Sequence, residues 1–167
     1  MEFELRKWLD ADAKSVQKYA NNKKIADNLR NSFPYPYTLK DAAEYIESFS
    51  KSEEKSFCRA ISVEGEAVGS VGIFLKDDVY CKSAEIGYWL AEPFWGNGIM
   101  SEAVKRICNA AFETYDIVRI FAEPYAYNNG SRRVLEKAGF TLEGILKKSV
   151  FKNDKIFDSC IYALVKQ

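Results

Sequence analysis

The most informative absence in the sequence is histidine, which does not occur in any of the 167 residues. Histidine is the side chain that most often acts as a general base near neutral pH, and it is also the most common metal ligand. Most hydrolase and metalloenzyme mechanisms therefore lack their usual residue. We expect no metal site, and any acid–base chemistry falls to Glu, Asp, Tyr, Lys, Cys or water.

Cysteine is scarce and scattered, since Cys58, Cys81, Cys108 and Cys160 show no CxxC spacing. Such thiols fit a reducing compartment better than a disulfide framework or a zinc site. The N-terminal segment "MEFELRKWLD" lacks the apolar core of a signal peptide. No apolar run approaches the roughly 18–20 residues that span a bilayer. We therefore expect a soluble, cytoplasmic protein.

An excess of charge of one sign is also missing, because Lys and Arg total 24 and Asp and Glu total 24. Bulk electrostatics do not draw a neutral chain to nucleic acid or to an anionic membrane, so we expect neither partner. With 47% hydrophobic residues, the chain fits one compact domain over residues 1–167. The sequence leaves open whether this domain is a monomer or a homodimer.

The spacing of apolar residues predicts the elements of the first third of the chain. A short alternating strand over residues 2–8 precedes helical spacing over 10–29, where Asp10 or Asp12 is the expected N-cap. Thr38 is the expected cap of a second helix. This part is therefore predicted to be one strand followed by two helices.

Turn residues divide the rest of the chain into six further segments. These are a hairpin around Glu64-Gly65, a strand over 84–92, a helix over 101–114, a strand over 118–127, a short helix from Asn128 or Asn129 to Gly139, and a hairpin around Asn153-Asp154. The strand–helix–strand unit should be parallel and right-handed, and the hairpins antiparallel. The predicted fold class is α/β (α+β), with a mixed central sheet of about seven strands and helices on both faces.

The stretch "FWGNGIMSEAVKRI" (94–107) places two glycines directly before a helix. A turn with Gly96 and Gly98 and a helix starting near Ser101 would gather several unpaired backbone amides around one point. The helix dipole adds partial positive charge, so this point suits phosphate oxygens. An ordinary strand-to-helix loop is the alternative, because a lone GxG is weak evidence. The P-loop and dinucleotide fingerprints are both absent.

Two segments carry a resemblance to a known family. "WGNGIMSEAV", followed about thirty residues later by "NNGSRRVLEKAGF", resembles the acetyl-CoA site of the GNAT N-acetyltransferases. "FPYPYTLKDAAEYI", "EIGYWLAEPFWGNGIM" and "DSCIYAL" resemble the ribosomal-protein N-terminal (Rim-type) branch. The resemblance implies a single-domain GNAT fold with a splayed parallel strand pair. It also implies acetyl-CoA as co-substrate and direct transfer of its acetyl group to a primary amine, with a protein N-terminus as one candidate acceptor.

The resemblance assigns cofactor binding to a set of residues, which are Leu90, Ala91, Trp95, Gly96, Asn97, Gly98, Ile99, Met100, Ser101, Asn128 and Ser131. The first two would pair with the pantothenyl arm through backbone groups, as an added strand does. Asn128 and Ser131 would contact the arm and its sulfur, which gives Ser131 a catalytic role. Simple sheet hydrogen bonds and helix capping are the alternatives for these four residues.

The sequence departs from the family's pattern at several positions. Trp95 stands where the superfamily has Gln or Arg, and Met100 stands where it has Gly or Ala. Asn97 replaces a residue that is often basic, so backbone amides and Arg132 or Arg133 would meet the phosphate charge. The position of the family's tyrosine general acid is occupied by Leu135, and the position of a Rim-type glutamate by Val150.

Two glutamates are left as candidates for the general base, Glu85 and Glu123. Transfer to an amine needs a neutral nucleophile, so a proton has to be removed near neutral pH. Glu85 is the first choice, because its strand runs directly into the glycine loop. A solvated or salt-bridged strand residue is the alternative for each glutamate.

The acceptor side of the site is the least specified. In the family, the loop that corresponds to "FPYPY" borders the acceptor, so Phe33, Tyr35 and Tyr37 are the candidate substrate-binding residues. A hydrophobic plug under the second helix is the alternative. Two other functions stay open, a small-molecule amine or polyamine acetyltransferase and a catalytically inactive CoA-binding regulatory module.

Overall fold

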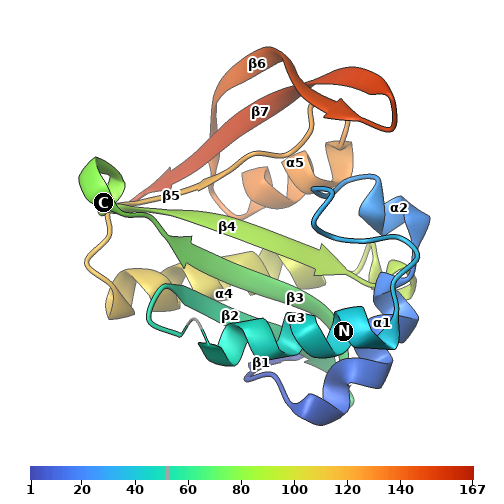
Figure 1. Ribbon diagram of the computed structural model, residues 1–167. Helices are drawn as coiled ribbons and strands as arrows, with labels where there is room; N and C mark the ends of the chain where they lie inside the picture. Colours follow the sequence, from blue (N-terminus) through green and yellow to red (C-terminus); the bar gives the residue numbers. More distant parts are fainter. Residues whose placement is uncertain (52) are drawn as a thin grey trace. The chain divides into compact units, whose positions relative to one another are not determined.

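The computed structural model describes residues 1–51 and 53–167 (Figure 1). The strands are β1 (Glu4–Arg6), β2 (Ser56–Val63), β3 (Glu66–Leu75), β4 (Ser83–Leu90), β5 (Arg119–Ala122), β6 (Thr141–Lys152) and β7 (Lys155–Val165). The helices are α1 (Ala13–Ala20), α2 (Lys23–Ala26), α3 (Leu39–Lys51), α4 (Ile99–Thr114) and α5 (Asn129–Lys137). Three single turns of 3₁₀ helix are η1 (Asp10–Asp12), η2 (Asp78–Tyr80) and η3 (Glu92–Phe94).

The strands form one seven-stranded mixed sheet in the order β1-β2-β3-β4-β5-β7-β6. β4 and β5 are parallel, whereas β5 pairs with β7 and β6 pairs with β7 in antiparallel fashion. The predicted fold class is therefore confirmed as a mixed sheet that contains helices and a parallel strand pair. The predicted strand–helix–strand unit corresponds to β4, α4 and β5.

The pairing between β4 and β5 covers only the beginning of β4. Ser83 lies opposite Arg119 and Glu85 lies opposite Phe121. β5 ends one residue later, at Ala122, whereas β4 continues to Leu90. A short shared register is what the splayed pair implied by the family resemblance requires.

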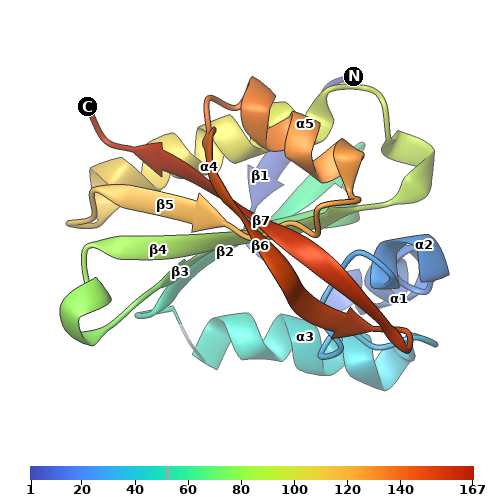
Figure 2. The same ribbon diagram turned by 90° about the horizontal axis from the view of Figure 1, so that it is seen from above.

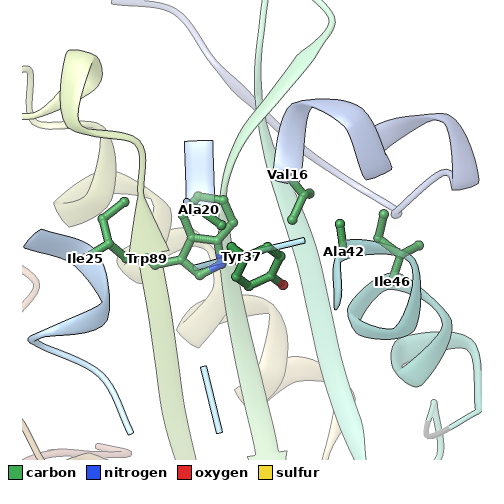
Figure 3. Close-up of a cluster of buried hydrophobic side chains, with 7 residues drawn as sticks. All are labelled: Val16, Ala20, Ile25, Tyr37, Ala42, Ile46 and Trp89. Carbon is green, nitrogen blue, oxygen red and sulfur yellow. The ribbon is translucent and has the colours of Figure 1, made fainter. Parts of the chain in front are cut away.

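The chain divides into two compact units. The first unit comprises Met1–Gly72 and Tyr88–Ile99, and the second comprises Ile73–Gly87 and Met100–Gln167. The core of the first unit is a cluster around the rings of Tyr37 and Trp89, which lie beside each other in Figure 3. The other members of this cluster are Val16, Ala20, Ile25, Ala42 and Ile46. Helices α1 and α3 therefore bury apolar side chains in a cluster that includes Trp89 of β4.

The second unit is built from α4, α5 and the C-terminal strands, with both helices on the same side of β5 and β7 (Figure 2). Asn128 caps α5, because its side-chain oxygen accepts a hydrogen bond from the Ser131 amide at 3.2 Å. Gly139 ends the same helix with φ +95°, and the Phe140 amide donates to the Leu135 carbonyl at 3.0 Å. The Gly139 amide donates to the Glu136 carbonyl at 3.1 Å, and together these two bonds at the end of α5 form a Schellman motif, as predicted from the position of the glycine.

Several local predictions are confirmed at their turns and caps. Thr38 caps α3, since its hydroxyl accepts from the Asp41 amide at 3.1 Å and the Asp41 carboxylate accepts from the Thr38 amide at 2.8 Å. Both hairpin turns have positive φ at their two central residues, which are Glu64, Gly65, Asn153 and Asp154. This geometry matches the right-handed twist of the flanking strands.

The single helix predicted over residues 10–29 is wrong. The structure has η1, α1 and α2 there, with a break at Asn21 and Asn22. Asp12 is not an N-cap by its side chain, because its carboxylate accepts two hydrogen bonds from Arg6 at 2.8 Å and one from the Leu9 amide at 2.9 Å. The helical spacing of apolar residues continues across the break, so the pattern alone concealed it.

Within the described ranges, no helix is long and apolar enough to cross a membrane. The same residues contain no cluster of three or more His, Cys, Asp or Glu side chains that could hold a metal ion.

Candidate functional site

The glycine loop has the backbone geometry that its sequence suggests. Gly96 and Gly98 have φ of +78° and +74°, a region that other residues rarely adopt. β4 ends at Leu90 rather than at residue 92, and α4 begins at Ile99 rather than near Ser101. The loop between them is therefore shifted slightly from its predicted bounds, and its tip over residues 95–98 is exposed.

The amides of this loop are free to bind a ligand. In the described part of the chain, no backbone N–H over residues 96–98 donates a hydrogen bond to a protein acceptor. The first amides of α4 follow directly, and the first four N–H groups of a helix have no intrahelical acceptor. Together with the helix dipole, these groups have the chemistry to bind anionic oxygens at the N-terminus of α4.

Two side chains hold the loop in this conformation. The indole Nε1 of Trp95 donates to the Leu90 carbonyl at 2.7 Å. The amide Nδ2 of Asn97 donates to the carbonyls of Phe94 and Trp95 at 3.1 and 3.2 Å. The carbonyl oxygens of Leu90, Phe94 and Trp95, which would repel a phosphate, are thereby hydrogen-bonded within the loop. The amides of residues 96–98 stay available to a ligand. Sequence reasoning missed both contacts, although Trp95 and Asn97 are two of the positions that depart from the family pattern.

The end of β4 offers fewer backbone groups than the sequence suggested. The Ala91 amide donates to Val68 at 2.8 Å, and the Ala91 carbonyl accepts from Phe94 at 3.0 Å. The Leu90 carbonyl is bound by Trp95. Of the four backbone groups of Leu90 and Ala91, at most the Leu90 amide is left for an extended ligand that adds itself to the strand.

The start of α5 in the second unit carries the other predicted cofactor residues. Asn128 is the N-cap described above, and Ser131 is partly exposed in the first turn. The guanidinium of Arg132 donates to the Tyr162 hydroxyl and to the Ala126 carbonyl, each at 3.1 Å. Arg132 is therefore committed to an internal network, and only Arg133 of the two arginines is exposed without such bonds.

The two candidate bases differ in their surroundings. The Glu85 carboxylate lies 3.4 Å from Lys76 Nζ, and its side chain is 16% exposed. Glu123 is exposed and directly follows the last residue of β5. Because Glu85 lies opposite Phe121 in a parallel register, Glu123 stands about 7 Å further toward the carboxyl ends of the strands. Ligands of parallel strand pairs bind at these ends, which places Glu123 better than the sequence suggested.

The three candidate acceptor residues lie in different surroundings. Tyr37 is 2% exposed in the core cluster, and burial raises the pKa of its hydroxyl. Phe33 packs on Tyr37 and on Trp89, with ring centroids 5.1 and 5.9 Å apart. Tyr35 between them is 52% exposed. Both ends of the segment, Phe33 and Tyr37, are thus packed in or against the core cluster, and the ring of Tyr35 between them is exposed to solvent.

A mixed sheet with a short parallel pair is followed here by a loop of free amides at a helix N-terminus, an arrangement that suits a phosphate-containing ligand. Comparison with known proteins identifies the family. The sequence profile of the acetyltransferase (GNAT) domain matches residues 2–141. The probable N-acetyltransferase YjcK of Bacillus subtilis is 37% identical over 126 residues, which cover 75% of this chain and 70% of that protein. The chain therefore belongs to the GNAT acetyltransferase family.

Further relatives and solved structures agree with this assignment. The ribosomal-protein-serine acetyltransferase of Escherichia coli is 34% identical over 102 residues, which cover 61% of this chain and 56% of that protein. The microcin C7 self-immunity acetyltransferase MccE, solved with acetyl-CoA and AMP, has a TM-score of 0.84 at 26% identity and covers 98% of this chain and 92% of its own. The structure of RimL in complex with CoA has a TM-score of 0.87 at 23% identity. The match covers 98% of this chain and 94% of RimL, which therefore shares the fold.

The protein is an N-acetyltransferase that uses acetyl-CoA as its co-substrate. The inactive CoA-binding module that the sequence left open is therefore set aside.

Trp95 provides a first test of the loop. Trp95→Phe keeps an aromatic ring but removes the hydrogen bond to Leu90, so we expect the Kd for CoA to rise about three- to tenfold, in line with roughly 1 kcal/mol for one hydrogen bond. Calorimetry measures this. Trp8→Phe is the control, because the indole N–H of Trp8 is buried and has no acceptor among the residues that the structure describes. An equal loss of CoA affinity in both variants would show a general effect of a Trp→Phe change on packing rather than the loss of the bond to Leu90.

Ser131 provides a second test. If its hydroxyl stabilises the departing sulfur, Ser131→Ala should lower kcat severalfold while the Kd for CoA changes little, since the interaction strengthens only in the transition state. Steady-state kinetics and calorimetry on the same preparation separate the two quantities. Equal losses in both, or no loss in either, would remove this role from Ser131.

Proposed function

We propose that this enzyme acetylates the α-amino group of a protein or peptide N-terminus. The observation that supports this acceptor is the similarity to ribosomal acetyltransferases. Besides the Escherichia coli enzyme described above, the putative ribosomal N-acetyltransferase YdaF of Bacillus subtilis is 34% identical over 104 residues, which cover 62% of this chain and 56% of that protein.

The proposed binding mode assigns a part of acetyl-CoA to each group. The amides over residues 96–101 bind the pyrophosphate, with Ile99 and Met100 buried beneath the loop as the first residues of α4. The Leu90 amide pairs with the pantothenyl arm. Asn128 holds the start of α5 in place, and the Ser131 hydroxyl donates to the sulfur.

The proposed chemistry is a direct acyl transfer. Glu123, or Glu85 in second place, accepts a proton from the ammonium form of the acceptor, directly or through water. The neutral nitrogen then forms a bond to the thioester carbon, and the carbon–sulfur bond breaks. The nitrogen loses a second proton as it becomes the amide, and the departing sulfur takes up a proton, so that CoA leaves as the free thiol, while the Ser131 hydroxyl stabilises the sulfur by donating a hydrogen bond to it. We expect no covalent acyl-enzyme.

One observation favours a second candidate acceptor, a small-molecule amine. MccE is 26% identical over nearly the whole chain, and its structure was solved in complex with acetyl-CoA and AMP. An aminoacyl compound joined to a nucleotide is therefore the small molecule that we would test first. We place either reaction in the cytoplasm, where four cysteines without a disulfide are expected.

A turnover screen decides between these acceptors. Thiol release from acetyl-CoA is followed with peptides that have a free N-terminus, the same peptides with a blocked N-terminus and an internal lysine, polyamines, and non-hydrolysable aminoacyl nucleotides. We expect turnover with the free N-termini, with mass spectrometry placing the acetyl group on the first residue. Turnover confined to polyamines or aminoacyl nucleotides would overturn the proposed acceptor.

A further inference from the structure

The break between α1 and α2 places two consecutive asparagines in one turn, and their side chains bind different segments. The Asn21 side-chain oxygen accepts from the Tyr37 amide at 2.9 Å. The Asn22 side-chain nitrogen donates to Glu92 Oε2 at 2.8 Å. Both contacts lie within the first unit. One turn of the chain therefore binds the acceptor segment (residues 33–37) and the loop root (Glu92–Phe94) at the same time.

The contact with Tyr37 determines where the acceptor segment lies. The Tyr37 amide is bound by Asn21, its carbonyl accepts from the Gln17 side chain at 3.3 Å, and its ring is buried. Tyr35 is only two residues away and is exposed. Any shift of the turn at Asn21 therefore moves the backbone from which the Tyr35 ring projects.

The contact with Glu92 determines where the glycine loop begins. Lys24 Nζ also donates to the Glu92 carboxylate, at 2.5 Å, and these two donors keep the pKa of that carboxyl below its usual value. The Glu92 backbone carbonyl accepts from the Trp95 amide at 3.1 Å. Glu92 thus connects the turn at Asn22 to Trp95, the residue whose indole binds the Leu90 carbonyl.

Asn22 has a second, separable role. Its side-chain oxygen caps α2 by accepting from the Lys24 amide at 2.9 Å, while its side-chain nitrogen makes the bond to Glu92. A serine at this position keeps an oxygen cap, but its shorter side chain lacks the amide nitrogen that reaches Glu92. The contact with Glu92 can therefore be removed while the helix start is retained.

We propose that Asn21 and Asn22 are positioning residues that couple the acceptor segment to the glycine loop, so that occupancy of the CoA loop by its ligand improves binding of the amine. Coupling between two binding sites is reciprocal, because each ligand changes the affinity of the other by the same factor. The proposal rests on the proposed function in one respect, namely that residues 33–37 border the acceptor. It predicts cross effects that two independent local contacts would not produce.

The test uses one variant at each end of the connection and measures the effect at the other end. Asn22→Ser does not alter a residue that contacts the acceptor segment, yet it should raise KM for the amine about three- to tenfold. Asn21→Ala does not alter a residue that contacts the loop root, yet it should raise the Kd for CoA by a similar factor in the absence of any amine. Asn21→Asp keeps an oxygen that accepts from Tyr37, so it should restore CoA affinity to within twofold of the parent.

Asn28→Ala is the matched control, because in residues 1–51 and 53–167 the Asn28 side chain donates to the Lys24 carbonyl of the same helical turn, at 3.0 Å, and to no other acceptor. Thermal unfolding of each variant identifies a simple loss of stability, which Asn28→Ala should show without any change in KM or Kd. If Asn22→Ser affects only CoA binding and Asn21→Ala affects only the amine, the coupling is refuted.

The two arms of the experiment also separate this inference from the proposed acceptor. KM is measured with whichever amine the turnover screen identifies. If that amine is a small molecule, the proposed function is wrong, but the same variants still test the coupling. The CoA arm needs no amine at all. An unchanged Kd for CoA in folded Asn21→Ala would overturn the inference even if peptide N-termini are acetylated.

Discussion

Replacing the general base with glutamine should lower the turnover rate roughly 10²–10⁴-fold, the usual contribution of a positioned base. We expect this loss for Glu123→Gln, and for Glu85→Gln if Glu85 is the base instead. Glutamine keeps the shape of the side chain but cannot accept the proton. The pH–rate profile of the correct variant should also lose its acidic limb, because the group that must be deprotonated is no longer present.

Lys76→Met separates catalysis from structure at Glu85. Lys76 Nζ lies 3.4 Å from the Glu85 carboxylate, so Lys76→Met breaks the same ion pair without removing the carboxylate. If Glu85→Gln and Lys76→Met reduce the rate equally, the ion pair supports the strand and Glu85 is not the base. Near-normal rates and unchanged pH profiles in both glutamine variants would exclude both carboxylates, and the proton would then leave through ordered water.

Gly98→Val should raise the Kd for CoA well over tenfold, which corresponds to more than about 1.4 kcal/mol. Gly98 has φ +74°, and a Cβ built on it meets no atom of the described chain within 4 Å apart from its two sequence neighbours. The valine side chain therefore fits in the free protein but strains the backbone and occupies the space above the amides. We expect the loss to appear in calorimetry with CoA alone, without an acceptor.

Gly65→Val is the control for the strain. Gly65 also has positive φ, at +85°, and a Cβ built on it also meets no atom within 4 Å, but it lies in the hairpin between β2 and β3. Both variants should lose similar stability on thermal unfolding, whereas only Gly98→Val should lose CoA affinity. Unchanged CoA binding in folded Gly98→Val would falsify the assignment of the phosphate site to this loop.

The elements that the sequence predicted well are those decided by neighbouring residues. The cap at Thr38, the end of α5 at Gly139 and the turn at Asn153 each depend on residues within five positions of one another. The glycine loop was recognisable for the same reason, because positive φ and a following helix are local properties. The parallel β4–β5 pair followed from the order of elements and the handedness rule.

The elements that the sequence did not predict depend on partners outside their own helix or strand. The break at Asn22 is stabilised by Glu92, seventy residues later, and the Asp12 carboxylate binds Arg6, six residues earlier, instead of capping the helix that it precedes. Arg132 was a candidate for phosphate binding, but Tyr162, thirty residues later, holds its guanidinium. None of these contacts leaves a periodic signal, so composition and spacing could not reveal them.

The hydrogen bonds of Trp95 and Asn97 have a consequence for the rate at which the cofactor binds. A flexible glycine loop has to be ordered when its ligand arrives, and that entropy is subtracted from the affinity. Here the carbonyls of Leu90, Phe94 and Trp95 are already paired, so the loop conformation that exposes its amides exists before any encounter. Association should then proceed in a single kinetic phase, without a slow step for loop closure, and differences in affinity among loop variants should arise mainly from dissociation.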